Sequence, residues 1–252
     1  MSHDRIVLGF DGITLAPGKA PVSGQLRMGE IAGLAGLEGQ GQEEFLLHLA
    51  GFRPRAPGQV TAHGPEGAHP LRNHHEAARQ GVTYLPRDRR ATGIFPVLSV
   101  LDNFGISALR RFSRLRVIDR RRQREELARQ TEFLSIRYLS MGAPITALSG
   151  GNQQKVLLAR MLALKPRVML LNDPTRGVDL NTRLKVYEAF RQLARDEGIA
   201  FVILSSEIEE ILQICDNVSI FRDFERTQVI PKAEMSMSAV MAAMFGQKED
   251  AA

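Results

Sequence analysis

Residues 148–155 read Leu148-Ser149-Gly150-Gly151-Asn152-Gln153-Gln154-Lys155 and directly precede a helix-forming run, Val156–Leu164. Serine is a favoured N-cap of helices, because its hydroxyl accepts a hydrogen bond from a backbone N–H in the first turn. Two following glycines leave further N–H groups accessible at the positive end of the helix dipole, where anions bind. This octapeptide therefore predicts an anion site at the start of a helix.

A glycine-rich loop, Gly36-Leu37-Glu38-Gly39-Gln40-Gly41-Gln42-Glu43, follows an apolar run and opens a second helix-like stretch. Its glycine spacing fits the phosphate-binding pattern G-x-x-x-x-G-K-[ST], in which backbone N–H groups approach a phosphate closely. The lysine of that pattern is replaced here by Gln42, and the hydroxyl residue by Glu43. An amide supplies no positive charge, and a carboxylate repels a triphosphate. The loop alone fits a tight strand–helix turn equally well.

Short apolar runs rich in β-branched residues alternate with helix-like stretches along most of the chain. This alternation is typical of a parallel sheet flanked by helices, and polar residues after such strands place a ligand at that edge of the sheet. The apolar runs are Ile31–Ala35, Val82–Leu85, Val168–Leu171, Ala200–Leu204 and Val218–Phe221, and helical spacing occurs in Glu43–Ala50, Asn181–Arg195 and Ile208–Ile214.

The composition is that of a soluble globular protein, with 252 residues, 44% hydrophobic and 24% charged. Cys215 is the single cysteine, so an internal disulfide is excluded. The apolar runs are too short to span a bilayer, and the first ten residues do not resemble a secretory signal. We therefore expect a cytoplasmic protein.

The net charge of +5 is concentrated between Arg110 and Arg129, where nine arginines stand against three acidic residues. Such a cluster fits a nucleic-acid or membrane-surface contact as well as a solvated helix face. Phe112 is the one aromatic residue in this segment, which weakens an interpretation based on stacking of bases.

The octapeptide at 148–155 resembles the signature motif of ATP-binding-cassette (ABC) ATPases, and VMLLNDPTRGVD at 168–179 looks like a Walker B strand followed by a D-loop. Together with SSEIEEIL at 205–212, these two motifs resemble the second nucleotide-binding half of ATPases from bacterial sugar importers of the ribose, galactose and xylose type. The resemblance runs from the glycine loop to Val218–Phe221, which is nearly the whole chain.

This resemblance implies a P-loop NTPase (RecA-like) α/β fold, with a mostly parallel sheet flanked by helices and an inserted helical subdomain. We expect a single ABC-type nucleotide-binding domain over residues 1–252. Its α/β core would comprise residues 1–96 and 150–246, its helical subdomain residues 97–149, and a frayed tail residues 247–252.

The resemblance also implies ATP and Mg²⁺ as ligands, yet the chain departs from the family at the charged positions of its own site. Asn172 stands where an aspartate helps to anchor Mg²⁺, Asp173 where a glutamate polarises water, and Glu207 where a histidine contacts the γ-phosphate. The segment Tyr84–Arg89 stands where a glutamine couples metal to transporter, and Phe10 is the nearest candidate to stack on adenine. The phosphate-loop positions are Gly36, Gly39, Gly41, Gln42 and Glu43. We expect weak nucleotide binding here; an acidic metal site built from Glu43, Asp173 and Glu207 is the alternative.

In this family two halves stack head to tail, and each ATP lies between one half's phosphate loop and the other half's signature. The intact signature therefore predicts that this chain acts on a partner's ATP through Ser149, Gly150, Gly151, Asn152 and Gln153, with Asp179 of the D-loop lining the seam. The resemblance implies an ABC-type ATPase that couples ATP hydrolysis to carbohydrate import, weak or inactive in isolation.

The implied partners are a second nucleotide-binding half, a membrane permease and, through the permease, an external sugar-binding protein. The chain would then lie in the cytoplasm, peripheral on the inner face of the bacterial plasma membrane, with anionic lipid as a further contact of Arg110–Arg129. A non-catalytic regulatory module on the same fold is the alternative, and a nucleic-acid-associated ABC protein is a third hypothesis. The sugar itself is not specified by this sequence.

Overall fold

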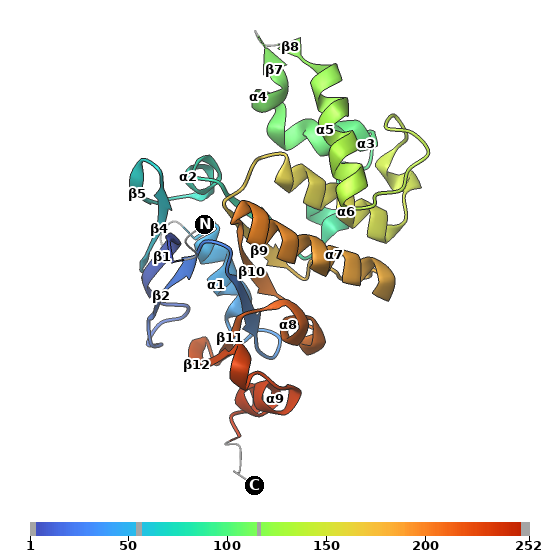
Figure 1. The fold of residues 1–252 in the computed structure, drawn as a ribbon. Helices are drawn as coiled ribbons and strands as arrows, with labels where there is room; N and C mark the ends of the chain where they lie inside the picture. The colour runs from blue at the N-terminus through green and yellow to red at the C-terminus, as the bar shows by residue number, and fades with distance from the viewer. Residues whose placement is uncertain (1–3, 54–56, 115–116, 248–252) are drawn as a thin grey trace. The chain divides into compact units, whose positions relative to one another are not determined.

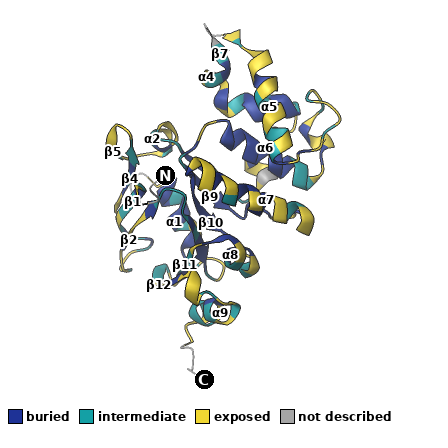
Figure 2. Cartoon of the chain, viewed as in Figure 1, coloured by how far each residue is buried: buried dark blue, intermediate teal, exposed yellow. Residues whose placement is uncertain are grey.

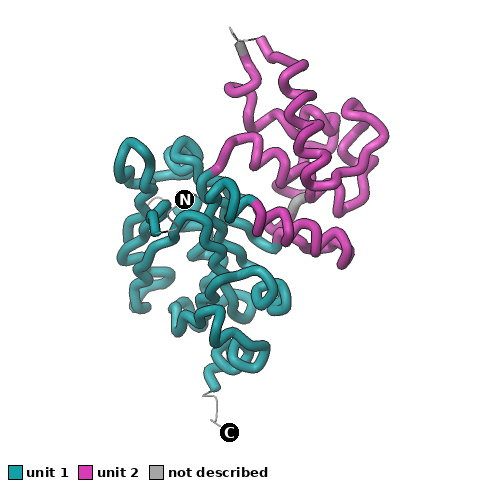
Figure 3. Tube along the Cα trace, viewed as in Figure 1, with its two compact units in different colours: residues 1–84, 167–173, 193–252 teal, residues 85–166, 174–192 magenta. Residues whose placement is uncertain are grey.

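The computed structural model describes residues 4–53, 57–114 and 117–247 (Figure 1). The chain divides into two compact units (Figure 3). Unit 1 comprises residues 1–84, 167–173 and 193–252, and unit 2 comprises residues 85–166 and 174–192. The predicted helical subdomain, residues 97–149, falls entirely within unit 2, although its boundaries stay a prediction. Most of the predicted frayed tail, residues 248–252, lies outside the described residues.

Unit 1 is built on two sheets. A four-stranded sheet has the order β2-β1-β4-β5, with β1 (Ile6–Ile13), β2 (Val22–Arg27), β4 (Gln59–Gly64) and β5 (Gly67–Pro70). A six-stranded sheet has the order β12-β11-β3-β10-β9-β6, with β3 (Ile31–Ala35), β6 (Val82–Leu85), β9 (Val168–Asn172), β10 (Ala200–Leu204), β11 (Asn217–Arg222) and β12 (Glu225–Pro231). The helices of unit 1 are α1 (Gln42–Leu49), α2 (His74–Arg79), α8 (Ile208–Ile214) and α9 (Met237–Phe245), with short turns at Leu193–Glu197 and Lys232–Glu234.

The predicted parallel sheet is confirmed, since β11, β3, β10 and β9 pair in parallel. Every residue of β9 and β10 is buried, which Figure 2 shows as dark blue, and buried parallel strands are near-continuous apolar runs. The four-stranded antiparallel sheet is an element that the sequence analysis missed. Its strands β2 and β5 carry polar residues, glycine and proline, so their apolar pattern is weak.

The core of unit 1 is formed where α1 packs against both sheets. Leu8 of β1, Leu46 of α1 and Leu170 of β9 are all fully buried in this cluster. Burying one such side chain stabilises the fold by roughly 1.5–3 kcal/mol. The ring of Phe45 lies 5.2 Å from those of both Phe10 and Phe221. The helix that begins at the glycine loop is therefore held firmly on the sheet.

Unit 2 is mainly helical. Its elements are a π-helical turn at Arg89–Gly93, α3 (Val100–Gly105), a turn at Ile106–Ala108, α4 (Leu109–Phe112), β7 (Ser113–Arg114), β8 (Val117–Ile118), α5 (Arg120–Phe133), a turn at Ile145–Ala147, α6 (Gly150–Leu162) and α7 (Leu180–Gln192). The predicted helical subdomain, residues 97–149, also contains two strands, because β7 and β8 form a small antiparallel pair. Two-residue strands are too short to produce an alternating sequence pattern.

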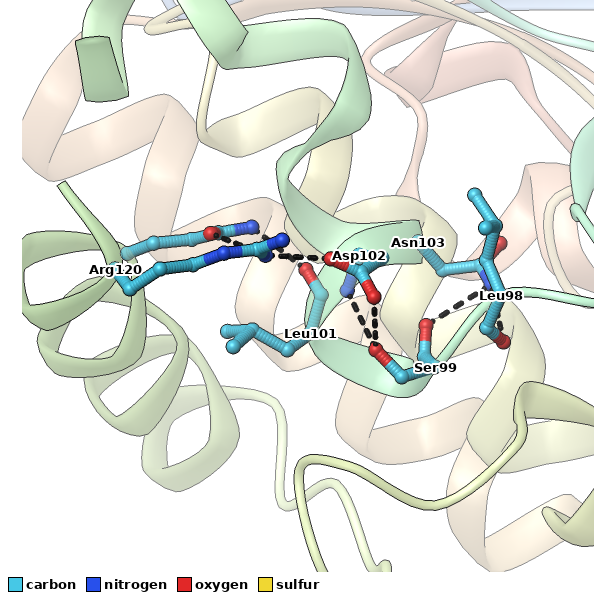
Figure 4. A network of polar contacts seen from close by, with 7 residues as sticks. Leu98, Ser99, Leu101, Asp102, Asn103 and Arg120 are labelled. Carbon is cyan, nitrogen blue, oxygen red and sulfur yellow. Dashed lines mark hydrogen bonds and ion pairs between the residues drawn. The ribbon is translucent and has the colours of Figure 1, made fainter. Parts of the chain in front are cut away.

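Polar contacts join α3 to α5 within unit 2, as Figure 4 shows, and a further hydrogen bond joins α3 to α6. Ser99 caps α3 by accepting a hydrogen bond from the backbone of Asp102, whose carboxylate also pairs with Arg120. Asn103 is fully buried and donates to backbone oxygens, including that of Leu98 at 3.1 Å. Arg160 of α6 donates to the backbone oxygen of Asn103, and burial lowers the pKa of this guanidinium to about 10. The helix that begins at the signature is thus anchored at its far end.

None of the helices in the described part of the chain is long and apolar enough to cross a membrane.

Candidate functional site

The glycine loop and Asn172 meet at the carboxyl edge of the parallel sheet in unit 1. The loop follows β3, Asn172 ends β9, and β10 lies between these two strands. Leu204 of β10 pairs in register with Leu34 of β3 and with Asn172 of β9. The structure therefore brings the glycine loop and Asn172 together at this edge.

The loop needs its glycines for packing as well as for a phosphate. Gly41 has a φ of 104°, and a Cβ there would lie 2.9 Å from Cα of Phe224 in the β11–β12 turn. A Cβ on Gly36 would lie 2.6 Å from the backbone oxygen of Phe221. The backbone N–H of Phe224 also donates to the backbone oxygen of Gln40 at 2.9 Å. The β11–β12 turn therefore packs directly on the loop.

Gln42 turns its side chain back into the loop. The residue is 6% exposed, and its Nε2 donates to the backbone oxygens of Leu37 at 2.8 Å and Gly36 at 3.3 Å. Its Oε1 is buried without a hydrogen-bond partner among the described residues. The side chain at the lysine position is therefore neutral and already engaged with the loop's own backbone.

Glu43 and Asn172 are in direct contact, although 129 residues separate them. Nδ2 of Asn172 donates to Oε1 of Glu43 at 2.9 Å, while Oδ1 of Asn172 is buried and has no partner among the described residues. Asn172 also forms a hydrogen bond with the hydroxyl of Tyr84. Burial raises the pKa of Tyr84; the hydrogen bond with Asn172 opposes this rise, and the Glu43 carboxylate adds to it.

This donor set does not fit a divalent cation. Mg²⁺ requires oxygen ligands, whereas Asn172 points an N–H group at the only carboxylate it contacts among the described residues. Among residues 4–53, 57–114 and 117–247, no group of three or more His, Cys, Asp or Glu side chains is arranged to hold a metal ion. Glu43, Asp173 and Glu207 fall within those ranges, so the acidic metal site considered above gains no support.

Asp173 and Glu207 lie at the same edge of unit 1. Oδ1 of Asp173 accepts a hydrogen bond from the backbone N–H of Ser206 at 2.7 Å, and its own N–H donates to Leu204 at 2.8 Å. Glu207 directly precedes α8, and its N–H donates to Oγ of Ser205 at 3.1 Å. Asp173 therefore contacts Ser206, the residue directly before Glu207 in the β10–α8 connection.

The signature forms the start of α6 in unit 2. The helix begins at Gly150 with Ser149 as its N-cap, as predicted. Nδ2 of Asn152 donates to Oγ of Ser149 at 3.0 Å, and Oδ1 of Asn152 accepts from the N–H of Arg137 at 2.8 Å. The Ser149 oxygen therefore acts as a hydrogen-bond acceptor, and the hydrogen of its hydroxyl group is available to donate to a ligand.

Gln153 is more buried than the other predicted signature residues. It is buried, and its Nε2 donates to the backbone oxygens of Leu148 at 3.0 Å and Ile145 at 3.3 Å. Its side chain therefore anchors the segment before α6. Ser149 is exposed, and Gly150, Gly151 and Asn152 are partly exposed.

Asp179 lies next to the signature within unit 2. Its Oδ1 accepts from the backbone N–H of Thr182 at 3.0 Å, and this hydrogen bond is the main cause that lowers the pKa of Asp179. A Cβ built on Gly151 would lie 3.9 Å from Oδ2 of Asp179. The structure therefore brings the D-loop position and the signature together.

Two further expectations concern Phe10 and the arginine cluster. The ring of Phe10 packs edge-on against Phe45 and contacts the core, so it belongs to the sheet packing. Several arginines are paired within unit 2, in the ion pairs Arg111–Glu126, Arg120–Asp102, Arg121–Glu125 and Arg129–Glu126. Arg116 lies outside the described residues. This internal pairing favours a solvated helix face over a nucleic-acid surface.

The sequence analysis missed the contact between Tyr84 and Asn172 and a set of basic side chains beside the signature. Tyr84 was noted only as the first residue of a segment that departs from the family. Of the basic residues, Lys155 closes the quoted octapeptide, while Arg137 and Lys185 stand in no motif. No pattern in the sequence links these last two residues to the signature.

Comparison with known proteins identifies the class of protein that this fold and these motifs define. The sequence profile of the family described as "ABC transporter" matches residues 20–176, so the chain belongs to the ABC transporter family. The solved structures of two ATP-binding cassettes confirm the predicted fold. MJ1267 has a TM-score of 0.77 at 18% identity, over 94% of this chain and 98% of the other. MJ0796, bound to ADP and Pi, has a TM-score of 0.74 at 17% identity, over 89% and 98%.

Among curated relatives, the chain is similar to sugar-transport ATP-binding proteins. The "Ribose import ATP-binding protein RbsA 2" of Rhizobium etli is 36% identical over 244 residues, which cover 96% of this chain and 47% of the relative. The "Galactofuranose transporter ATP-binding protein YtfR" of Escherichia coli O157:H7 is 39% identical over 226 residues, which cover 89% and 44%. The chain therefore spans about half the length of the curated relatives it matches.

Proposed function

We propose that this chain is a nucleotide-binding half of a carbohydrate ABC importer whose own ATP site is degenerate, and that it donates its signature to the ATP site of a partner half. The observation that carries this proposal is the hydrogen bond from Asn172 to Glu43. It joins the two positions that would hold Mg²⁺ in an ABC ATPase, and it uses an N–H group where an oxygen ligand is needed.

The lack of any lysine or arginine in the phosphate loop, residues 36–43, supports weak binding of nucleotide in the chain's own site. Gln42 brings no charge to the β- and γ-phosphates, and its Nε2 already donates to the loop's backbone oxygens. Glu43 adds a negative charge beside the position of a triphosphate, which raises the cost of binding. Weak or absent hydrolysis by the isolated chain follows from these two features.

The signature retains the groups that act on a partner's γ-phosphate. The hydroxyl of Ser149 and the backbone N–H groups at the start of α6 are hydrogen-bond donors at the positive end of this helix. Donors that are fixed before charge develops stabilise a transition state, because they need no reorganisation during the reaction. Asn152 fixes the Ser149 oxygen, and Asp179 borders the same surface.

The relatives' names support sugar import as the process. We propose a second nucleotide-binding half, a membrane permease and an external sugar-binding protein as partners. We propose that the chain corresponds to the second half of such relatives and works at the inner face of the membrane through its permease. ATP and Mg²⁺ would then be bound chiefly by the partner's phosphate loop.

A mixed pair tests this proposal. The chain is combined with a partner half that carries an intact phosphate-loop lysine and Walker B carboxylates, and ATP hydrolysis is measured with Ser149→Arg. We expect hydrolysis to fall at least about 100-fold, because the arginine side chain displaces the donors from the phosphate. Ser140→Arg, at an exposed serine of the same unit, is the matched control and should hydrolyse ATP normally. Unchanged turnover with Ser149→Arg would overturn the proposal.

A further inference from the structure

A groove of about 690 Å³ lies beside the signature, and all of its lining residues belong to unit 2. Ser149, Gly151 and Asn152 form one wall, and the first turns of α7, from Asn181 to Glu188, form another. Pockets of roughly 300–1,000 Å³ enclose small-molecule ligands. This groove therefore has room for more than the single phosphate group that the signature alone contacts.

Three basic side chains line this groove: Arg137, Lys155 and Lys185. They come from three separate parts of the sequence, the loop after α5, the second turn of α6 and the outer face of α7. In the part of the chain that the structure describes, none of the three forms an ion pair. Their charges are therefore not neutralised by direct contacts within the chain.

The positive charges of Arg137 and Lys185 act on Lys155. The residue is 4% exposed, and its Nζ donates to the backbone oxygen of Ser135 at 2.9 Å. Burial lowers the pKa of Lys155, and repulsion from Lys185 and Arg137 lowers it further, against the attraction of Asp179. An anion in the groove would relieve this repulsion, because an opposite charge nearby favours the charged form of a lysine.

The lining also indicates which anion fits. Two carboxylates, Asp179 and Glu188, border the groove, and Asp179 is already engaged by the N–H of Thr182. None of the lining residues is aromatic, and Leu184 is the one large apolar side chain among them. A nucleobase has nothing to stack on here. Several phosphate groups in a chain match the spread of three cations better than one compact anion does.

We propose that this groove binds a polyphosphate chain, with Arg137, Lys155 and Lys185 holding phosphates beyond the one that meets Ser149. The inference deepens the proposed function and rests on it, because it assigns the groove to the phosphate chain of the partner's ATP. It also predicts a property of the isolated chain, which binds a polyphosphate without a base and without Mg²⁺.

Calorimetric titration of the purified chain with sodium tripolyphosphate at low ionic strength, without Mg²⁺, tests this inference. We expect saturable binding that Lys185→Glu weakens by about tenfold or more, since a unit of positive charge is replaced by a negative one at the ligand. Arg124→Glu is the matched control, because it makes the same charge change at an exposed position of α5 that does not line the groove. It should change the affinity less than about twofold, through long-range screening alone.

If Lys185→Glu fails to fold, the neutral variants Lys185→Gln and Arg137→Gln provide the same test. Each removes one positive charge and should weaken tripolyphosphate binding by less than the charge reversal does. Equal affinity in Lys185→Glu and Arg124→Glu, or no binding of tripolyphosphate to the unaltered chain, would overturn the inference. If that happens while Ser149→Arg still stops turnover in the mixed pair, signature donation stands and only the polyphosphate groove is rejected. If tripolyphosphate binding depends on Lys185 but Ser149→Arg does not change ATP hydrolysis by the mixed pair, the proposed function is rejected instead.

Discussion

Asn172, the last residue of β9, donates a hydrogen bond across 2.9 Å to Glu43 in the first turn of α1. This contact ties the helix after the glycine loop to the edge of the parallel sheet by protein groups alone. In an ATPase that binds Mg²⁺, an anionic side chain at the end of this strand would face a cation. Here a neutral amide donates a hydrogen bond to a carboxylate, so the pair forms without a metal and carries one negative charge.

Asn172→Asp should convert this contact into a site that responds to divalent cations. Two carboxylates at hydrogen-bond distance repel each other, so we expect the free energy of unfolding to fall by roughly 1–3 kcal/mol without metal. Mn²⁺ or Mg²⁺ should restore part of this loss, because oxygen ligands now surround the position. Thermal unfolding with and without the cation measures both effects. The double variant Asn172→Asp with Glu43→Gln is the control, and a metal response of equal size in it would contradict the assignment.

The combination Gln42→Lys, Glu43→Ser and Asn172→Asp should strengthen binding of Mg-ATP. The lysine supplies a positive charge for the phosphates, the serine supplies a hydroxyl ligand for Mg²⁺, and the aspartate supplies a carboxylate for the same cation. We expect a gain of at least about tenfold in affinity, measured by calorimetric titration with ATP in the presence and absence of Mg²⁺. Gln42→Lys alone should give a smaller gain. If the triple variant gains nothing, the β11–β12 turn, whose Phe224 hydrogen-bonds the loop, is what keeps it closed.

Asp102 should contribute to stability in a pH-dependent manner. Its pKa is lowered by the hydrogen bond with Ser99 and by Arg120, so the folded state favours the carboxylate. The contribution is present above the ordinary aspartate pKa of about 3.9 and is lost as the pH falls through the lowered value. Urea unfolding across the acid range should show a flatter dependence in Asp102→Asn. The effect should stay below about 1 kcal/mol, because this carboxylate is partly exposed and screened. Glu66→Gln, at an exposed position, should retain the full acid dependence.

Arg160→Met should destabilise the chain. Arg160 is buried, donates to the backbone oxygen of Gly93 at 2.6 Å and also bonds the backbone oxygen of Asn103. Methionine fills similar space but leaves both oxygens without a donor, at a cost of about 2–4 kcal/mol. Chemical denaturation measures the loss, with Arg124→Met as an exposed control. A difference between the two variants of less than about 0.5 kcal/mol, the usual range for surface substitutions, would show that solvent reaches these oxygens.

The parallel sheet could be predicted from the sequence because burial on both faces makes its strands apolar throughout. Ile31–Ala35, Val82–Leu85 and Ala200–Leu204 have the same bounds in the structure as in the sequence analysis. The antiparallel sheet could not be predicted in this way. Strands such as β2 and β5 expose polar residues and pair through backbone hydrogen bonds, which leave little trace in composition.

The candidate site was predictable only as far as motifs extend. The glycine loop and the signature are continuous in sequence, so their positions were found directly. The contact between Glu43 and Asn172 depends on the strand order, in which β3, β10 and β9 are consecutive, and no local sequence pattern specifies that order. The groove depends on one loop and two helical segments that converge on one surface, and no local pattern records such a convergence.

The residues of the chain's own nucleotide site and those of its signature are encoded in different compact units. Gly36–Glu43, Asn172, Asp173 and Glu207 belong to unit 1, whereas Ser149–Gln153 and Asp179 belong to unit 2. The hydrogen bonds described above hold each set within its own unit. Over evolutionary time, one surface can lose its chemistry by drift while purifying selection maintains the other.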